Sequence, residues 1–155
     1  MEYERFTDDA RKVMQVANQE AQRFNHPLIS TEHLLFALLR DVDTALLLKK
    51  FNVELYRIRR DLEQVMQADP EMNTIGKLPM ASKVKRAIDY AMFEAESLDH
   101  FYVGTEHLLL GLLRESENVA AEVLMHAGVT LEKMREEVGT ALADAKKASD
   151  VASRR

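Results

Sequence analysis

The feature that most constrains this chain is an internal repeat. Residues 26–40 read HPLISTEHLLFALLR, and residues 100–114 read HFYVGTEHLLLGLLR. The matching register continues upstream, where Ala17, Glu20 and Ala21 correspond to Ala91, Glu94 and Ala95. A repeat of this length predicts one structural unit folded twice, with the two copies packed together to bury their apolar faces.

The first helix of each copy is predicted from apolar residues at helical spacing, which mark one buried face. They are Ala10, Val13, Met14, Ala17, Ala21 and Phe24 in the first copy, and Val84, Ala87, Ile88, Ala91, Ala95 and Leu98 in the second. The second helix is Leu-rich, and we expect it to be deeply buried. Thr31 and Thr105 are predicted to be its N-cap residues, because a threonine hydroxyl accepts a hydrogen bond from an unpaired amide of the first turn.

Two shorter helices complete each copy. The third helices are predicted over residues 44–51 and 118–127, and the fourth over residues 54–67 and 130–144. Asn52 and Gly128 follow the third helices and are residue types that tolerate the left-handed conformation after a helix end. No strand is needed, so the sequence predicts an all-α fold of two tandem four-helix repeats with pseudo-twofold symmetry.

The domain boundaries follow from the same alignment. The double-repeat domain is expected over residues 1–144, with repeat one at 6–66 and repeat two at 80–142. Residues 67–79 contain Pro, Gly and Asn and are predicted to be the linker between the repeats. Residues 145–155 are small and polar, which is typical of a frayed helix end or a linker.

Composition excludes several classes of function. The 21 basic and 26 acidic residues give a formal charge of -5, which argues against a nucleic-acid partner and favours protein partners. The absence of Cys removes disulfides, thiolate zinc sites and thiol nucleophiles. Apolar runs such as residues 34–39 are far shorter than the roughly 20 residues that cross a bilayer, so no membrane partner is expected. The charged first residues lack the apolar segment of a signal peptide, and a cytoplasmic location is expected.

The repeated motif resembles a known family. Two four-helix copies, each with Thr-Glu-His-Leu-Leu followed by Leu-Leu-Arg, resemble the double N-terminal repeat of Clp-type AAA+ protein unfoldases over residues 6–142. Residues 5–7 and 104–115 resemble the ClpC branch more closely than the ClpB branch. The resemblance implies a front-end domain, without metal or cofactor, that binds adaptor proteins and substrates and passes them to the AAA+ ring of the same or another chain.

The sequence leaves three hypotheses for the function of the chain. The chain lacks the G-x-x-x-x-G-K-[ST] phosphate loop, so it is expected to bind no ATP and to be no enzyme by itself. It is therefore predicted to be an excised recognition domain or, alternatively, a free-standing accessory or decoy protein that binds the Clp assembly or sequesters its substrates. A hydrolase is a third hypothesis, but the sequence has no Ser-His-Asp constellation and no nucleophile elbow.

Three residues are candidates for ligand binding. In the ClpC branch that the chain resembles, the motif glutamate is associated with phosphoarginine, and Glu32 and Glu106 occupy that position here. A carboxylate pairs with a guanidinium in fork geometry, although a glutamate in a first helical turn is also favoured by the helix dipole. The resemblance also gives Thr7 a role in holding the modified group, with an N-cap as the alternative.

The two copies are expected to differ as binding sites. Ala81 stands where the second copy would have the threonine, and Ser82 is predicted to cap the helix instead. We therefore expect a stronger site with Thr7 and Glu32 and a weaker one with Glu106, because a hydrogen bond to a charged group contributes about 1.5 to 3 kcal/mol. Asp8 and Asp9, which follow Thr7, act against this order because their negative charges would repel a phosphate.

The histidines of the motif are not expected to bind metal. Adjacent helical residues point about 100° apart, so Glu32 and His33 cannot chelate one ion, and the same holds for Glu106 and His107. His26 and His100 lie at the ends of the first helices. They are predicted to hydrogen-bond the free carbonyls there.

Overall fold

The structure is a computed structural model that describes residues 4–68, 74–140 and 151. Its regular elements are all helices: α1 (Asp8–Arg23), α2 (Thr31–Leu38), α3 (Val42–Lys49), α4 (Leu55–Val65), α5 (Ser82–Ser97), α6 (Thr105–Glu115), α7 (Val119–His126) and α8 (Leu131–Thr140). This order confirms the all-α, twofold four-helix prediction. The predicted tail at 145–155 lies outside the described residues, apart from Val151, which is buried.

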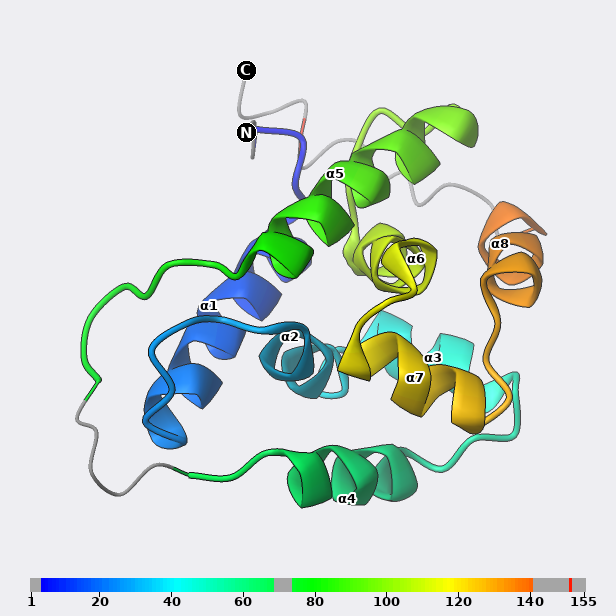
Figure 1. The fold of residues 1–155 in the computed structure, drawn as a ribbon. Coiled ribbons are helices and arrows are strands. Elements are labelled where there is room, and N and C mark those ends of the chain that lie inside the picture. The colour runs from blue at the N-terminus through cyan, green and yellow to red at the C-terminus, as the bar shows by residue number, and fades with distance from the viewer. Residues whose placement is uncertain (1–3, 69–73, 141–150, 152–155) are drawn as a thin grey trace.

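The two Leu-rich helices lie at the centre of the molecule. Figure 1 shows α2 and α6 in the middle, with the other helices around them. Every residue of α2 except Glu32 is buried, and so is every residue of α6 except Arg114. The α2 helix has 8 residues and is shorter than α6, which has 11.

The N-caps of α2 and α6 lie one residue earlier than predicted. Ser30 and Gly104 are the N-caps, so the prediction that Thr31 and Thr105 are caps is wrong. The reason lies in the histidines: the amides of Ser30 and Gly104 each donate to the Nδ1 atom of the histidine three residues later, at 2.9 Å. The histidine rings thus accept from the amides of the N-cap residues and fix the helix starts there.

Side-chain caps and left-handed residues set the ends of the short helices. Asp41 caps α3 through a 3.0 Å bond from the Thr44 amide, so this helix begins earlier than predicted. Asn118 caps α7 in the same way at 2.8 Å. Asn52 and Gly128 have φ of 57° and 93°, which confirms their predicted left-handed conformation.

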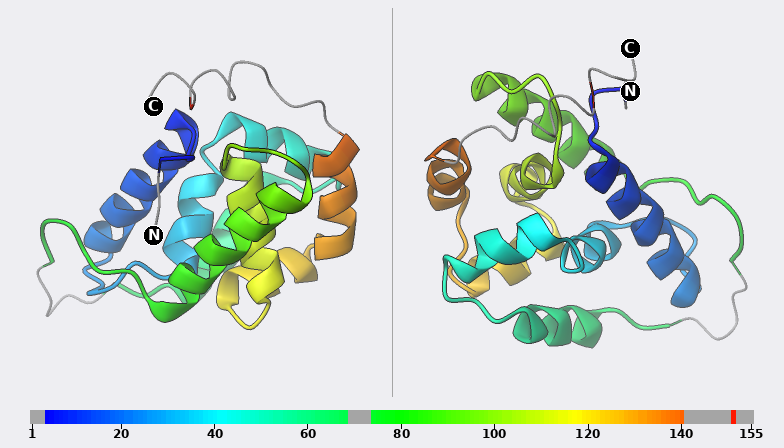
Figure 2. Two further views of the ribbon diagram at one scale, coloured as in Figure 1. Left: turned by 90° about the horizontal axis from the view of Figure 1, so that it is seen from above. Right: turned by 180° about the vertical axis from the view of Figure 1, so that it is seen from behind.

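The two repeats are interlocked through their C-terminal helices. In each repeat, the third helix packs against the second helix of the other: α3 against α6, and α7 against α2. The fourth helices contact the third helices of the opposite repeat, α4 against α7 and α8 against α3, as well as the second helix of their own repeat. Figure 2 shows α8 beside α3 in both views. Burial of each repeat therefore depends on its neighbour.

Two isolated β-bridges also cross between the repeats. Phe6, which precedes α1, pairs with Val103, which precedes α6. In the equivalent place, Met80 precedes α5 and pairs with Ile29, which precedes α2. The Thr7 amide donates to the Val103 carbonyl at 3.0 Å, and the Ala81 amide donates to the Ile29 carbonyl at 2.9 Å. The residue before each first helix is thus held beside the second helix of the opposite repeat.

Each repeat has one buried carboxylate on its first helix, and this carboxylate pairs with two arginines. Glu20 accepts from Arg23 at 2.8 Å and from Arg40 at 2.9 Å. Its counterpart Glu94 accepts from Arg114 at 2.8 Å and from Arg135 of α8 at 2.7 Å. Burial raises the pKa of Glu94, but the hydrogen bonds and charges of Arg135 and Arg114 outweigh burial and leave this pKa below its ordinary value.

Among the described residues, no helix combines the length and apolarity needed to cross a membrane.

Candidate functional site

Thr7 lies at the start of α1 as its N-cap. Its hydroxyl oxygen accepts from the Ala10 amide at 3.1 Å, and its side chain is buried. This geometry confirms the capping role, which was the alternative to ligand binding. The oxygen is used in the cap, and the hydroxyl hydrogen can still be donated to a ligand.

Glu106 lies folded back at the start of α6. A Cβ atom added at Gly104 would be 2.0 Å from the Glu106 Oε1 atom, so the carboxylate lies against the Gly104 backbone. Only a glycine leaves room for it, whereas the first repeat has Ser30 at the equivalent position. Glu106 is 9% exposed, and it must rotate before it can pair with an external guanidinium.

The structure places Thr7 with Glu106 and not with Glu32. Thr7 and Gly104 each follow a member of the bridged pair Phe6 and Val103, so they lie on neighbouring backbones. The Glu106 carboxylate is against that same Gly104. The predicted grouping of Thr7 with Glu32 in one site is therefore wrong, because the β-bridges cross between the repeats.

Glu32 lies at the equivalent place in the first repeat, where α2 begins near the N-terminus of α5. It is partly exposed, and its Oε1 atom accepts from the Thr31 hydroxyl at 2.9 Å. The hydrogen bond from the Ala81 amide to the Ile29 carbonyl brings the start of α5 beside the start of α2, where Glu32 lies. Ala81 is the N-cap of α5 and makes no side-chain cap, so the prediction that Ser82 caps this helix is wrong. The first turn of α5 therefore presents amides that no side chain caps.

The charges around the two sites have opposite signs. Asp8 and Asp9 are exposed in the first turn of α1, beside Thr7. Lys83 and Lys85 are exposed in the first two turns of α5, and the Lys83 ammonium donates to the Glu117 carbonyl. An anionic group is therefore favoured at the α5 site and disfavoured at the α1 site.

Two histidine pairs support the sites, and the sequence reasoning missed them. His26 Nδ1 lies 2.8 Å from His33 Nε2, and His100 Nδ1 lies 2.9 Å from His107 Nε2. The His26 Nε2 atom contacts the Gln67 carbonyl at 2.6 Å, so this histidine bonds the end of the α4 segment instead of the end of α1. The identical spacing of the histidines in the two repeats is the sequence signal that could have predicted these pairs.

The His33 ring is neutral in this arrangement. Its Nδ1 atom accepts from the Ser30 amide, so Nε2 carries the hydrogen and donates to His26. Burial lowers the pKa of His33 to about 4, and the nearby His26 adds to this shift. Among the described residues, no group of three His, Asp or Glu side chains is placed to hold a metal ion.

Comparison with known proteins identifies the family. The model of the Clp repeat (R) N-terminal domain matches residues 5–122 and 79–154. The chain is 43% identical over 141 residues to the "Negative regulator of genetic competence ClpC/MecB" of Bacillus subtilis, covering 89% of this chain and 17% of that protein. It is 39% identical over 145 residues to the "Chaperone protein ClpB" of Oceanobacillus iheyensis, with the same coverage of 89% and 17%.

Solved structures share the fold. The Hsp104 N-terminal domain of Candida albicans gives a TM-score of 0.74 at 18% identity, covering 94% of this chain and 98% of that one. A complex of the ClpV N-domain with a VipB peptide gives a TM-score of 0.73 at 13% identity, covering 88% of this chain and 86% of that one. The chain spans 17% of the length of the ClpC and ClpB relatives. It belongs to the Clp repeat N-terminal domain family, and the ClpC relative is more similar to it than the ClpB relative.

Proposed function

We propose that this chain is the recognition domain of a cytoplasmic Clp-type ATP-dependent unfoldase and is not itself catalytic. It binds adaptor proteins and protein substrates and delivers them to an AAA+ ring on the same or another chain. The observation that carries the proposal is the 43% identity to ClpC over 89% of this chain. The ClpV N-domain has been solved with a peptide of VipB, which supports a protein-binding role for this fold.

The finer part of the proposal is that the two sites bind phosphoarginine side chains. A carboxylate at the start of α2 or α6 pairs with the guanidinium, and the amides at the start of α5 or α1 receive the phosphate. Each site then takes its carboxylate from one repeat and its phosphate donors from the other, because the β-bridges bring these termini together. Glu32 serves the α5 site, and Glu106 with Thr7 serves the α1 site.

The α5 site is proposed to bind more tightly. Glu32 is partly exposed, the first turn of α5 has no side-chain cap, and two lysines lie nearby. At the α1 site, Glu106 is buried against Gly104, Thr7 already caps the helix and two aspartates repel a phosphate. The Thr7 hydroxyl favours the α1 site, but the accessible carboxylate and uncapped amides together outweigh one hydrogen bond.

The test is binding of an unfolded protein with phosphorylated arginines to the immobilised chain, measured by biolayer interferometry. The phosphorylated protein should bind at least about tenfold more tightly than its dephosphorylated form, which corresponds to roughly 1.4 kcal/mol. The double variant Glu32→Gln/Glu106→Gln should lose this preference. The control variant Glu54→Gln/Glu132→Gln removes the same charge from exposed positions at the starts of α4 and α8. This control should keep the preference for the phosphorylated protein. Equal binding of both protein forms by the wild-type chain would refute phosphoarginine recognition.

A further inference from the structure

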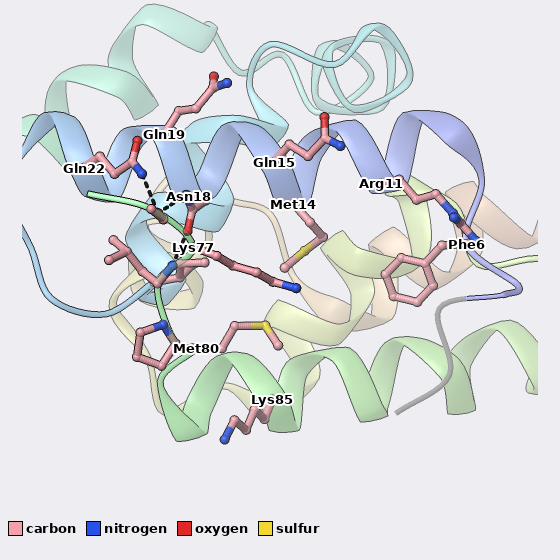
Figure 3. Close-up of a pocket in the computed structure, with 14 residues that line it drawn as sticks. Phe6, Arg11, Met14, Gln15, Asn18, Gln19, Gln22, Lys77, Met80 and Lys85 are labelled. Carbon is pink, nitrogen blue, oxygen red and sulfur yellow. Dashed lines mark hydrogen bonds between the residues drawn. The ribbon is translucent and has the colours of Figure 1, made fainter. Parts of the chain in front are cut away.

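A groove between α1 and α5 lies apart from the carboxylates of the two sites. It encloses about 890 Å³, which is within the range of ligand-binding cavities. Its lining comes from one face of α1 between Arg11 and Gln22, from residues 76–80 of the connector, and from Lys85 of α5. Figure 3 shows Met14 and Met80 facing each other across the gap, with the Lys77 side chain reaching between them.

One wall of the groove is fixed by hydrogen bonds. The Asn18 side chain accepts from the Leu78 amide at 2.8 Å and donates to the Gly76 carbonyl at 3.0 Å. Gln22 also donates to the Gly76 carbonyl. The connector is therefore held along α1, and the groove exists before any ligand arrives, which reduces the entropy lost on binding.

The charged residues that line the groove are all basic. Arg11, Lys77 and Lys85 contribute to the lining, and among the residues that the structure describes no acidic side chain does. The acidic residues of α1 and α5 all lie outside it: Asp8, Asp9, Glu20, Asp89, Glu94 and Glu96. Neither Lys77 nor Lys85 forms an ion pair within the described part of the chain, although the whole chain has a charge of -5. The positive charge is therefore available to a partner.

The rest of the lining combines amide side chains of α1 with a larger apolar part that includes Met14 and Met80. Met14 and Met80 are flexible and polarizable, and such residues adapt to ligands of different shape. Ile75, the residue before the lining segment, is 81% exposed, which is unusual for a large apolar side chain. An apolar surface beside unpaired lysines fits a ligand that carries both apolar and acidic groups.

We infer that this groove binds an extended acidic segment of a partner protein in which apolar residues alternate with Asp or Glu. The apolar side chains enter between Met14 and Met80, and the carboxylates pair with Lys77 and Lys85. The lining of α1 extends over about 16 Å at 1.5 Å per residue, which matches roughly five residues of an extended peptide. The inference rests on the proposed role of the chain as a protein-binding domain and adds a partner chemistry of opposite sign to phosphoarginine recognition.

The test is fluorescence anisotropy with a labelled peptide of sequence Glu-Leu-Glu-Leu-Glu and with its Gln-Leu-Gln-Leu-Gln counterpart. The acidic peptide should bind with a Kd on the order of 10 to 100 μM and at least about tenfold more tightly than the neutral one. Its affinity should fall as salt is added, because these lysines are exposed. Equal affinities for the two peptides, or no binding by either, would overturn the inference.

Two double variants locate the binding. Lys77→Glu/Lys85→Glu should weaken binding of the acidic peptide by at least about tenfold. Lys12→Glu/Arg86→Glu causes the same change in charge at exposed positions of α1 and α5 outside the lining, and binding should stay within about twofold. Equal losses in both would show a general charge effect and overturn the site. The variant Glu32→Gln/Glu106→Gln should keep peptide binding, because neither glutamate lines the groove. A failure of phosphoarginine recognition can therefore be distinguished from a failure of peptide binding in the groove.

Discussion

At the scale of single residues, the two repeats use the same residue types in different states. Glu32 is partly exposed and bonded to Thr31, whereas Glu106 is folded against Gly104. The sequence itself shows a glutamate at each position and an alanine, Ala81, where the second repeat would have the threonine. The sequence could not show that the Glu106 side chain lies against the backbone, because this conformation depends on the space beside Gly104. The sequence also could not predict that Thr7 lies beside the start of α6, since a single β-bridge leaves no strand pattern in the sequence.

His33 should make the stability of the protein sensitive to acid. Its pKa is about 4 in the folded protein and 6.5 in its ordinary state, so the unfolded chain binds more protons between these values. The stability that neutral His33 provides is complete above pH 6.5 and is lost as the pH falls towards 4. We expect His33 to lower the free energy of unfolding by about 2 kcal/mol between pH 7 and pH 5.

Urea unfolding at both pH values measures this effect. Glutamine at position 33 can accept from the Ser30 amide and donate to His26 without titrating, so His33→Gln should show a smaller fall in stability than the wild type. His126 is exposed on α7, and His126→Gln should retain the wild-type fall. A His33→Gln variant with unchanged pH dependence would contradict the assigned histidine pair.

Glu94 should contribute more to stability than its counterpart Glu20. Glu94 receives two bonds from Arg135 and one from Arg114, and these arginine side chains are 43% and 35% exposed. Glu20 receives one bond from each of two arginines that are 54% and 50% exposed. We expect Glu94→Gln to cost about 2 to 3 kcal/mol and Glu20→Gln about 1 to 2 kcal/mol, since better-solvated arginines lose less when the carboxylate is removed. Urea unfolding at pH 7 would contradict this order if Glu20→Gln were the more destabilising change.

At the scale of elements, α5 and α6 pack with their backbones in close approach at Gly111. A Cβ atom at Gly111 would be 2.0 Å from the Ala87 carbonyl oxygen, which is backbone and cannot move aside. The first repeat has Ala37 at the equivalent position. The sequence predicted both helix pairs from periodicity, but this difference in their spacing appears only in the packed structure.

The variant Gly111→Ala tests that crossing. It should destabilise the protein by about 1 to 3 kcal/mol through overpacking, although alanine has the higher helix propensity. Gly139→Ala in α8 is the matched control, because its nearest contact would be an ordinary 3.5 Å to the Leu98 side chain. That change should stabilise the protein by about 0.5 to 1 kcal/mol. Thermal unfolding followed by circular dichroism measures both, and a neutral Gly111→Ala variant would mean that the helices are not so closely packed.

At the scale of the whole molecule, the two repeats form one interlocked unit. The duplicated motif predicted two four-helix halves, and the structure confirms them. It did not predict the exchange by which α4 packs on α7 and α8 on α3, because helical periodicity marks a buried face without saying which helix covers it. The two β-bridges also join the start of each first helix to the opposite repeat, so each candidate site draws residues from both repeats.

The composite sites give the most direct test of the account, which is calorimetric titration of phosphoarginine into paired variants. In the Glu32→Gln background only the Glu106 site remains, and adding Thr7→Ala should weaken binding by at least about tenfold, because a hydrogen bond to the charged phosphate is lost. In the Glu106→Gln background only the Glu32 site remains, and Thr7→Ala should change the affinity by less than about twofold, since Thr7 lies beside the other repeat. Circular dichroism of each variant checks that removing the α1 cap leaves the protein folded. A Thr7→Ala effect confined to the Glu106→Gln background, or no binding by the wild-type chain, would contradict the account.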